Sequence, residues 1–237
     1  MKKIKAALII IGDEILSGRT QDKNINFLAI NLAQIGIILS EVRVIGDFEN
    51  EIIDAVNEMR KKFDYVFTSG GIGPTHDDIT SASIAKAFQV KIELNQEAEQ
   101  ILHKFYGVEI NEARLKMAMI PYGASLLDNP VSSAPGFRIE NVFVMAGIPK
   151  IFQAMFFAAS KELQGGDLIL SKEIKIDLTE SKIAKSFGDL QGKYKDVAMG
   201  SYPFDGGTSL VFRSTNKENL EQSFEEMQKI IAELKLS

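Results

Sequence analysis

The sequence predicts an α/β protein whose larger part is a doubly wound, mostly parallel sheet, followed by a small α+β domain. Three observations lead to this prediction. Short apolar runs alternate with helical patterns, which is typical of βαβ units. The strand segments are almost continuously apolar, as strands covered on both faces are. The alternation changes near Gln164-Gly165-Gly166-Asp167, which predicts domains at residues 1–165 and 166–237.

The larger domain opens with a predicted strand, because Ile4–Ile11 is a short apolar run. A helix is expected over 23–35, where apolar residues recur on one face and Gly36 follows as a helix end. The remaining elements rest on the same two patterns. We predict further strands over 37–45, 64–69, 125–127, 136–139 and 142–145, and further helices over 50–62, 79–88, 95–106, 111–119 and 149–163.

The small domain has a different order of elements. We predict strands over 172–178, 197–202 and 209–213 and helices over 180–190 and 217–236. This βαββα order is similar to a KH-like or split ferredoxin-like module. Its closing helix is acidic, and it lacks the Gly-x-x-Gly loop of nucleic-acid-binding KH domains. We therefore expect a structural or dimerising appendage, with RNA binding as the alternative.

The composition is that of an ordinary globular protein. Of the 237 residues 45% are hydrophobic, and a net charge of -5 without runs of Lys or Arg makes nucleic acid an unexpected partner. The absence of cysteine excludes disulfides, thiolate zinc sites and cysteine nucleophiles. The apolar run after Lys5 is too short for a signal peptide, and no run is long enough to span a membrane. A cytoplasmic protein is expected.

A glycine-rich segment, Ser69-Gly70-Gly71-Ile72-Gly73-Pro74-Thr75-His76-Asp77-Asp78, follows a predicted strand and precedes a predicted helix. Glycines let backbone N–H groups approach a phosphate, and a helix N-terminus adds partial positive charge. The predicted phosphate-binding residues are Ser69, Gly70, Gly71, Gly73, Pro74 and Thr75. The two aspartates that follow are unexpected in a site for anions alone. A divalent cation between them and a phosphorylated ligand would explain them.

Three other predicted strands end in glycine turns. These turns are Gly12-Asp13-Glu14, Gly46-Asp47 and Ala146-Gly147-Ile148-Pro149. Parallel strands place their carboxyl ends at one edge of the sheet, where open α/β proteins bind ligands. Gly12, Gly147 and Pro149 are therefore further predicted ligand-binding residues. As an alternative, each glycine only makes a tight turn, and Pro149 only begins a helix.

Four aspartates are candidates for metal binding or catalysis. Asp13, Asp77 and Asp78 are the predicted ligands of a divalent metal, Mg²⁺, Mn²⁺ or Co²⁺. Asp47 and Asp78 are the predicted catalytic bases, chosen by position. Each assignment has a structural alternative. Asp47 can belong to a turn, Glu14 can be a solvated loop charge, and one of Asp77 and Asp78 can cap the following helix while the other binds the ligand.

Several common site types are absent from the sequence. The glycine-rich segment lacks the Gly-Lys-Ser/Thr ending of a Walker loop and does not fit a dinucleotide fingerprint. No serine has a Gly-x-Ser-x-Gly setting. His76 and His103 each lack a second histidine at ligand spacing, so we expect no zinc site. Both histidines are expected at the surface.

These residues resemble the molybdopterin-binding (MogA/MoaB-type) fold and, within it, the CinA family (competence/damage-inducible protein A). The resemblance covers residues 4–163. It is carried by Gly12-Asp13-Glu14-Ile15-Leu16-Ser17-Gly18 with Asn24, Gly70-Gly71-Ile72-Gly73-Pro74-Thr75 with Asp77-Asp78, Asn129-Pro130-Val131 with Ala134-Pro135-Gly136-Phe137, and Gly147-Ile148-Pro149. Gly200-Ser201-Tyr202-Pro203 resembles the family's small second domain, and Ala146 stands where many relatives have proline. The deamidase domain of the long CinA proteins is expected to be absent.

The resemblance implies three functions. Relatives are associated with metal-dependent hydrolysis of ADP-ribose-type diphosphates, and a similar Gly-Pro-Thr-His-Asp-Asp motif is linked to FAD hydrolysis. The first expectation is therefore a metal-dependent pyrophosphatase acting on ADP-ribose or FAD-like nucleotides. The second is a pterin-binding or adenylyl-transfer protein of molybdenum cofactor assembly, and the third is a binding module without catalysis. The expected partner is a small phosphorylated nucleotide or pterin. A homo-oligomer is expected because relatives of this fold form dimers or trimers.

Overall fold

The computed structural model describes residues 3–236, with side chains described through Leu234. The chain divides into two compact units, the first ending at Gly166 and the second beginning at Asp167. The division lies one residue after the boundary predicted from the sequence. Each unit has its own hydrophobic core and is described by itself.

The first unit contains most of the predicted elements. Its strands are β1 (Ile4–Ile11), β2 (Ile37–Ile45), β3 (Tyr65–Ser69), β4 (Ile92–Leu94), β5 (Met119–Pro121), β6 (Ser125–Leu127), β7 (Gly136–Ile139) and β8 (Val142–Met145). Its helices are α1 (Asp13–Leu16), α2 (Asn24–Gln34), α3 (Glu49–Lys62), α4 (Thr80–Ala87), α5 (Gln96–Tyr106), α6 (Glu112–Leu115) and α7 (Pro149–Ala159). Three 3-10 turns accompany them, η1 (Gly107–Glu109), η2 (Lys116–Ala118) and η3 (Ser160–Glu162).

Six strands form the central sheet, in the order β2-β1-β3-β8-β7-β6. The four strands from β2 to β8 are parallel, and β7 and β6 are antiparallel to their neighbours. The mostly parallel sheet is thus confirmed. Because β1, β2, β3 and β8 run in the same direction, their carboxyl ends lie at one edge of the sheet.

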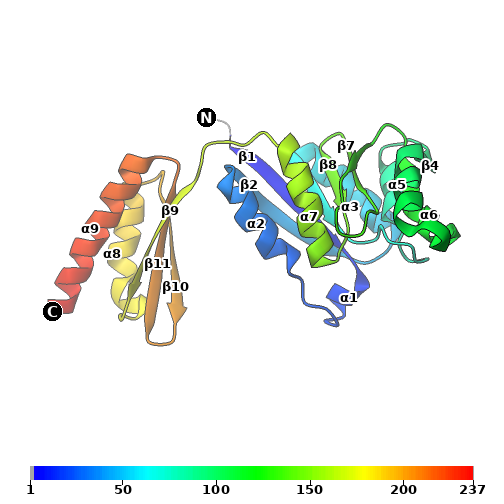
Figure 1. The fold of residues 1–237 in the computed structure, drawn as a ribbon. Coiled ribbons are helices and arrows are strands. Elements are labelled where there is room, and N and C mark those ends of the chain that lie inside the picture. Colours follow the sequence, from blue (N-terminus) through cyan, green and yellow to red (C-terminus); the bar gives the residue numbers. More distant parts are fainter. Residues whose placement is uncertain (1–2, 237) are drawn as a thin grey trace. The chain divides into compact units, whose positions relative to one another are not determined.

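Helices cover both faces of this sheet, as a doubly wound fold requires (Figure 1). Strand β1 shows why, because its side chains alternate between two fully apolar environments. Ala6, Leu8 and Ile10 pack with residues of α2 and α7, whereas Ala7, Ile9 and Ile11 pack with residues of α3 and α4. Burial on both faces explains the continuous apolar run that the sequence shows.

One predicted helix of the first unit is wrong in part. Residues 111–119 were expected to form one helix, but α6 ends at Leu115, η2 follows, and Met119 begins β5. Strand β5 pairs with β4 in an antiparallel two-stranded sheet that the sequence analysis did not predict. Both strands have three residues, too few for the period of two to be seen. Cross-strand pairing with a distant segment overrides the helical pattern here.

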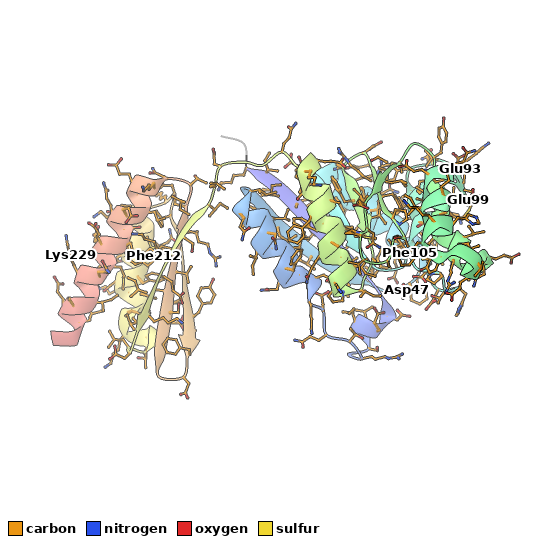
Figure 2. All side chains as sticks on the ribbon, viewed as in Figure 1. Asp47, Glu93, Glu99, Phe105, Phe212 and Lys229 are labelled. Atoms are coloured by element: carbon orange, nitrogen blue, oxygen red, sulfur yellow. The ribbon has the colours of Figure 1, made fainter. Side chains whose placement is uncertain are left out.

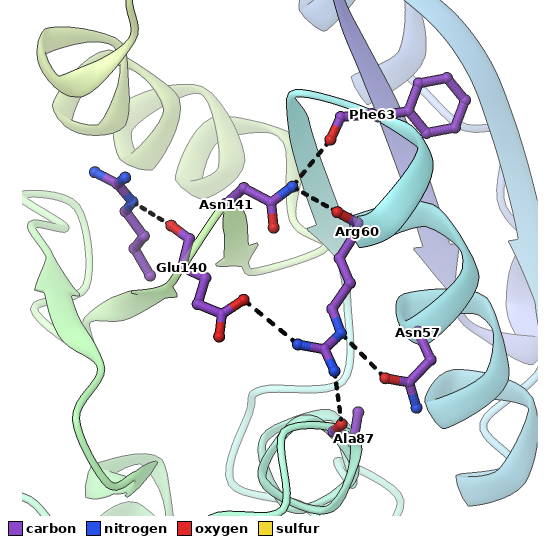
Figure 3. Close-up of polar contacts among 7 residues, drawn as sticks. Asn57, Arg60, Phe63, Ala87, Glu140 and Asn141 are labelled. Atoms are coloured by element: carbon purple, nitrogen blue, oxygen red, sulfur yellow. Dashed lines mark hydrogen bonds and ion pairs between the residues drawn. The ribbon is translucent and has the colours of Figure 1, made fainter.

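The amino edge of the central sheet is closed by side chains that bind backbone carbonyls (Figure 3). Asn141, in the β7–β8 turn, donates through Nδ2 to the carbonyl oxygens of Arg60 and Phe63, at 3.0 Å each. The Arg60 guanidinium contacts Glu140 at 3.4 Å, donates to the Ala87 carbonyl and lies 4.1 Å from the centre of the Phe88 ring. These bonds fasten the ends of α3 and α4 to the hairpin.

The second unit has the predicted βαββα order. Its elements are β9 (Leu170–Ile176), α8 (Glu180–Lys193), β10 (Ala198–Phe204), β11 (Gly207–Ser214) and α9 (Lys217–Leu236). The strands form an antiparallel sheet in the order β10-β11-β9. Phe212, labelled in Figure 2, is fully buried and meets Phe187 of α8 and Phe224 of α9 edge-on. Among the helices of residues 3–236, none combines the length and the apolar character needed to cross a membrane.

Candidate functional site

A cleft of about 510 Å³ lies at the carboxyl edge of the central sheet. The turns after β1, β2, β3 and β8 all contribute to it, as the four glycine turns of the sequence predicted. The predicted site residues that line it are Asp47, Gly70, Gly71, Gly73, Pro74, Asp77, Asp78, Gly147 and Pro149. Four other predicted site residues, Gly12, Asp13, Ser69 and Thr75, are not among its lining residues. Figure 2 labels Asp47.

Gly70 and Gly71 are required by the backbone of the β3–α4 turn. Their φ angles are 114° and 69°, a region that side chains with a Cβ rarely adopt. A Cβ on Gly70 would lie 2.1 Å from the carbonyl oxygen of Ile11, and one on Gly71 would lie 2.1 Å from Thr80 Oγ1. The turn therefore packs directly against the end of β1 and the start of α4, with no space for a larger residue.

The backbone N–H groups of this edge divide into two sets. The N–H of Gly12 donates to the Ile45 carbonyl at 3.1 Å, and that of Gly70 donates to the Met145 carbonyl at 3.0 Å. These two predicted ligand-binding amides thus extend the sheet. Within the described chain, the N–H groups of Gly71, Ile72 and Gly73 donate no hydrogen bond. All three residues line the cleft, so their amides are donors available to an anion there.

Helix α7 begins at the same cleft. Its cap residue Ile148 and its first residue Pro149 both line the cleft, and the helix is 11 residues long. The positive end of the helix dipole therefore lies beside the unpartnered amides of the β3–α4 turn. Proline fits this first helical position because no N–H is needed there.

Asp78 stabilises the turn at the end of the glycine-rich segment by binding Thr75. Its Oδ2 accepts hydrogen bonds from the backbone N–H of Thr75 at 2.8 Å and from the Thr75 hydroxyl at 2.5 Å. Both donors of Thr75 are thus taken by the chain itself, so its predicted role as a phosphate donor is not supported by this geometry. Helix α4 begins at Thr80 after the cap residue Ile79, with no side-chain cap. Asp78 therefore does not cap this helix.

Lys116 fastens the same segment from a distant part of the chain. It lies in η2, and its Nζ donates to the carbonyl oxygen of Thr75. Sequence analysis did not find Lys116, since nothing near it in the sequence indicates contact with a segment 41 residues away. The pKa of the Asp77 carboxyl is lowered, first by the nearby Thr75 hydroxyl and its own backbone N–H and to a smaller extent by His76 and Lys116.

Asp47 is a half-buried carboxylate of the cleft, as Asp78 is, whereas Glu14 and Asp77 are exposed. Burial raises its pKa above the ordinary aspartate value, and the negative charges of Asp13, Glu14 and Asp77 act in the same direction. The backbone N–H of Asp13 donates to Asp47 Oδ2 at 3.0 Å, which partly opposes this shift. Asp47 therefore stabilises the turn through its hydrogen bond with Asp13 and still has a carboxyl group with a raised pKa.

Asp13 and the histidine of the glycine-rich segment lie outside the cleft lining. The Asp13 side chain lies against Gly46, where a Cβ would be 2.7 Å from Asp13 Oδ1. Its backbone N–H, rather than its carboxylate, reaches a residue of the cleft. The His76 side chain is 100% exposed, and its Nδ1 lies 3.9 Å from Asp77 Oδ1.

The cleft supplies hard oxygen donors for a cation. Glu14, Asp47, Asp77 and Asp78 are its carboxylates, and no Lys or Arg is among its lining residues. Within residues 3–236, no three His, Cys, Asp or Glu side chains lie close enough together to hold a metal ion by themselves. Mg²⁺ commonly takes one or two protein carboxylates together with phosphate oxygens and water. The donor set therefore fits a cation that arrives with a phosphorylated ligand.

Ser69 and Asn24 lie below the cleft. Both residues are 2% exposed. The Asn24 Nδ2 group donates to Ser69 Oγ and to the Gly147 carbonyl oxygen, at 2.9 Å each. Ser69 was predicted to contact a phosphate, but its hydroxyl instead forms a buried contact with Asn24. Asn24 is one of the residues that carry the family resemblance, and no role was predicted for it.

Comparison with known proteins agrees with this geometry. The family model described as "Probable molybdopterin binding domain" matches residues 7–164. The crystal structure of CinA from Thermoplasma acidophilum, described as a protein with unknown function, is 34% identical, with a TM-score of 0.63 and coverage of 67% of this chain and 98% of that one. The chain belongs to the molybdopterin-binding-domain family and is of the CinA type.

The second unit of this CinA-type protein matches a different family model, described as "FAD synthase, middle domain", over residues 168–236. A protein of Pyrococcus abyssi is 33% identical and covers both units, with 95% of this chain and 96% of the relative aligned. A "Probable FAD synthase" of Caenorhabditis elegans is 33% identical over 84% of this chain. The aligned region spans 43% of that relative, less than half of its length.

Proposed function

We propose that this CinA-type protein is a divalent-metal-dependent pyrophosphatase of nucleotides such as FAD or ADP-ribose. One observation carries the proposal. The unpartnered N–H groups of Gly71, Ile72 and Gly73 and the carboxylates of Asp47, Asp77 and Asp78 line the same cleft. The amides suit a phosphate, and the carboxylates suit the cation that accompanies a diphosphate. The FAD synthase names of the second-unit model and of the worm relative support a flavin nucleotide as substrate.

The charge of the cleft favours a substrate that carries a cation. A diphosphate without a cation would meet four carboxylates and no lining Lys or Arg, and like charges at short range repel strongly. Asp77 and Asp78 would hold the cation together with the phosphate oxygens of the substrate. When bound, Mg²⁺ or a similar ion supplies electrostatic stabilisation of the charge on the leaving phosphate.

The chain's own residues provide the remaining parts of the reaction. The amides of Gly71, Ile72 and Gly73 bind one phosphate and orient the phosphorus atom. Water adds to that phosphorus, the bond to the bridging oxygen breaks, and FAD yields FMN and AMP. Asp47 accepts the proton from water, and its raised pKa brings it closer to the range that suits a general base at neutral pH.

A second candidate function follows from the family model of the first unit. Its description as a probable molybdopterin-binding domain favours a pterin phosphate as ligand of the same amides. Binding of the pterin, or transfer of an adenylyl group to its phosphate, would use the cleft without hydrolysing a dinucleotide. Tight capture of molybdopterin without release of AMP from FAD or ADP-ribose would favour this second function.

The test is release of AMP by the purified full chain from FAD and from ADP-ribose, with Mg²⁺, Mn²⁺ or Co²⁺ and with chelator. We expect turnover that depends on the cation. Asp78→Asn keeps an oxygen that can accept the Thr75 hydrogen bonds but removes the charge, so we expect at least about tenfold slower hydrolysis with little change in melting temperature. Asp54→Asn, at an exposed position of α3, is the charge-matched control. Equal rates for the two variants would contradict the role of Asp78.

A further inference from the structure

The side chain of Asn24 points into the protein and takes no part in capping its own helix. Asn24 is the first residue of α2 and follows the N-cap position, which Lys23 occupies without a side-chain cap. Here Asp22 Oδ1 accepts the backbone N–H of Ile25 at 2.8 Å. The Asn24 amide instead binds Ser69 and Gly147, and the residue is 2% exposed.

The Asn24 amide joins the ends of two neighbouring strands. Ser69 is the last residue of β3, and Gly147 lies in the turn between β8 and α7. One Nδ2 group donates to both, at 2.9 Å to Ser69 Oγ and 2.9 Å to the Gly147 carbonyl oxygen. The two turns also touch, because a Cβ on Gly147 would lie 3.3 Å from the Cα of Gly70. A single side chain thus fixes both turns that form this side of the cleft.

The orientation of the amide is determined by its partners. A carbonyl oxygen can only accept, so the NH₂ group and not Oδ1 must face Gly147. This orientation leaves Asn24 Oδ1 buried without a hydrogen-bond partner in the described structure. A buried acceptor without a donor costs free energy, and such groups in folded proteins call for an explanation other than stability.

We propose that Asn24 is a positioning residue of the phosphate-binding cleft. Its two hydrogen bonds hold the β3 end and the β8–α7 turn at a fixed separation, and this keeps the amides of Gly71, Ile72 and Gly73 beside the N-terminus of α7. Asn24 does not contact the substrate, since it is not among the lining residues of the cleft. The positioning role depends on the proposed pyrophosphatase function only where AMP release is used to test it.

The test compares Asn24→Ala and Asn24→Leu with Asn31→Ala in the full chain. Asn31 is a matched control, because it lies on the same helix and its Nδ2 donates to the Phe27 carbonyl oxygen at 2.8 Å, away from the cleft. Asn24→Leu replaces the amide, including the unpartnered acceptor, with an apolar group of similar size. Amide hydrogen exchange is measured for two peptides, one that contains the hydrogen-bonded amides of Gly70 and Thr75 and one that contains those of Ile151 and Phe152. The values of kcat and KM are measured for AMP release from FAD with Mg²⁺.

We expect both Asn24 variants to exchange faster in both peptides and not elsewhere in the central sheet. We expect kcat/KM to fall about tenfold to a hundredfold, because a shift of the bound phosphate by a fraction of an ångström misaligns it. Most of the loss should be in kcat if the amides act in the transition state. Asn31→Ala should leave exchange in both peptides and kcat/KM within about twofold of the parent protein.

Ser69→Ala provides an independent arm, because it removes one of the two acceptors and leaves Asn24 in place. It should speed exchange only in the peptide that contains Gly70 and Thr75. The positioning role would be overturned if Asn24→Leu left exchange unchanged in both peptides. If neither Asn24 variant folds, unchanged exchange in Ser69→Ala would overturn it. Exchange does not depend on turnover. Absence of AMP release by the parent protein, combined with faster exchange in the Asn24 variants, would therefore overturn the proposed function and leave the positioning role supported.

Discussion

The two edges of the central sheet use their polar groups differently. At the amino edge, side chains close the turns, as Asn141 does for the carbonyls of Arg60 and Phe63 and Tyr65 Oη does by accepting the N–H of Gln164 at 2.9 Å. At the carboxyl edge, the N–H groups from Gly71 to Gly73 have no partner in the described chain, and four carboxylates line the adjacent cleft. Satisfied groups at one edge stabilise the fold, and unsatisfied groups at the other can bind a ligand.

Gly70→Ala tests the carboxyl edge and has the largest expected effect. Alanine at a φ of 114°, with a Cβ 2.1 Å from the Ile11 carbonyl oxygen, forces the turn to move. We expect the free energy of unfolding to fall by about 2 kcal/mol or more and AMP release to fall at least about a hundredfold. Denaturant unfolding and the kinetic assay measure the two effects.

The control for Gly70→Ala is Gly188→Ala in α8, where a Cβ would meet nothing within 4 Å. This variant should be stabilised by about 0.5–1 kcal/mol, since alanine is the better helix former. Full activity of Gly70→Ala in spite of a loss of stability would mean that the carboxyl edge is a tight corner of the fold and not a ligand site.

Asn141→Ala tests the amino edge. It removes two 3.0 Å hydrogen bonds to the carbonyls of Arg60 and Phe63, so we expect the free energy of unfolding to fall by about 1–3 kcal/mol. We expect kcat/KM to stay within about twofold of the parent value, since the change lies at the opposite edge from the cleft. Asn50→Ala, at an exposed position of α3, serves as the control. A large loss of activity with unchanged stability would show that the two edges are coupled.

Glu14→Gln tests the role of Asp47 at the carboxyl edge, through a smaller effect on the pH dependence of kcat/KM. If Asp47 is the base, it acts when ionised, so kcat/KM rises with pH as Asp47 loses its proton. Its raised pKa places this acid limb above the pH expected for an ordinary aspartate. Removing the Glu14 charge lowers the pKa of Asp47, so the limb should move to lower pH. An unmoved limb, or the same shift in the exposed α3 control Glu51→Gln, would contradict this assignment.

The fold was largely predictable from the sequence because its central strands β1, β3 and β8 are mostly apolar and buried on both faces. Strands β1 and β2 have the predicted bounds. The clearest case is β1, which is apolar and buried from Ala6 to Ile11, whereas β2 at the edge of the sheet carries Ser40, Glu41 and Arg43. The two strands β4 and β5 were missed, since each has three residues and depends on the other for its pairing. Local periodicity carries no information about such a partner.

The candidate site was predictable at the level of its turns but not of its hydrogen bonds. Parallel topology alone brings the four glycine turns to one edge. Which amides remain available could not be predicted, because the bonds of Gly12 to Ile45 and of Gly70 to Met145 join segments that are distant in the sequence. The same holds for the contact of Lys116 with Thr75. Contacts of this kind depend on tertiary packing and leave no local pattern.

The contact between Lys116 and Thr75 has a consequence for how such a protein can change. The lysine belongs to the segment from β4 to β5, which forms its own small sheet beside the main one. A substitution in that accessory sheet can shift the lysine and, through it, the rim of the cleft, while every strand of the main sheet stays as it is. Selectivity could therefore diverge among relatives through an outlying segment that never meets the substrate.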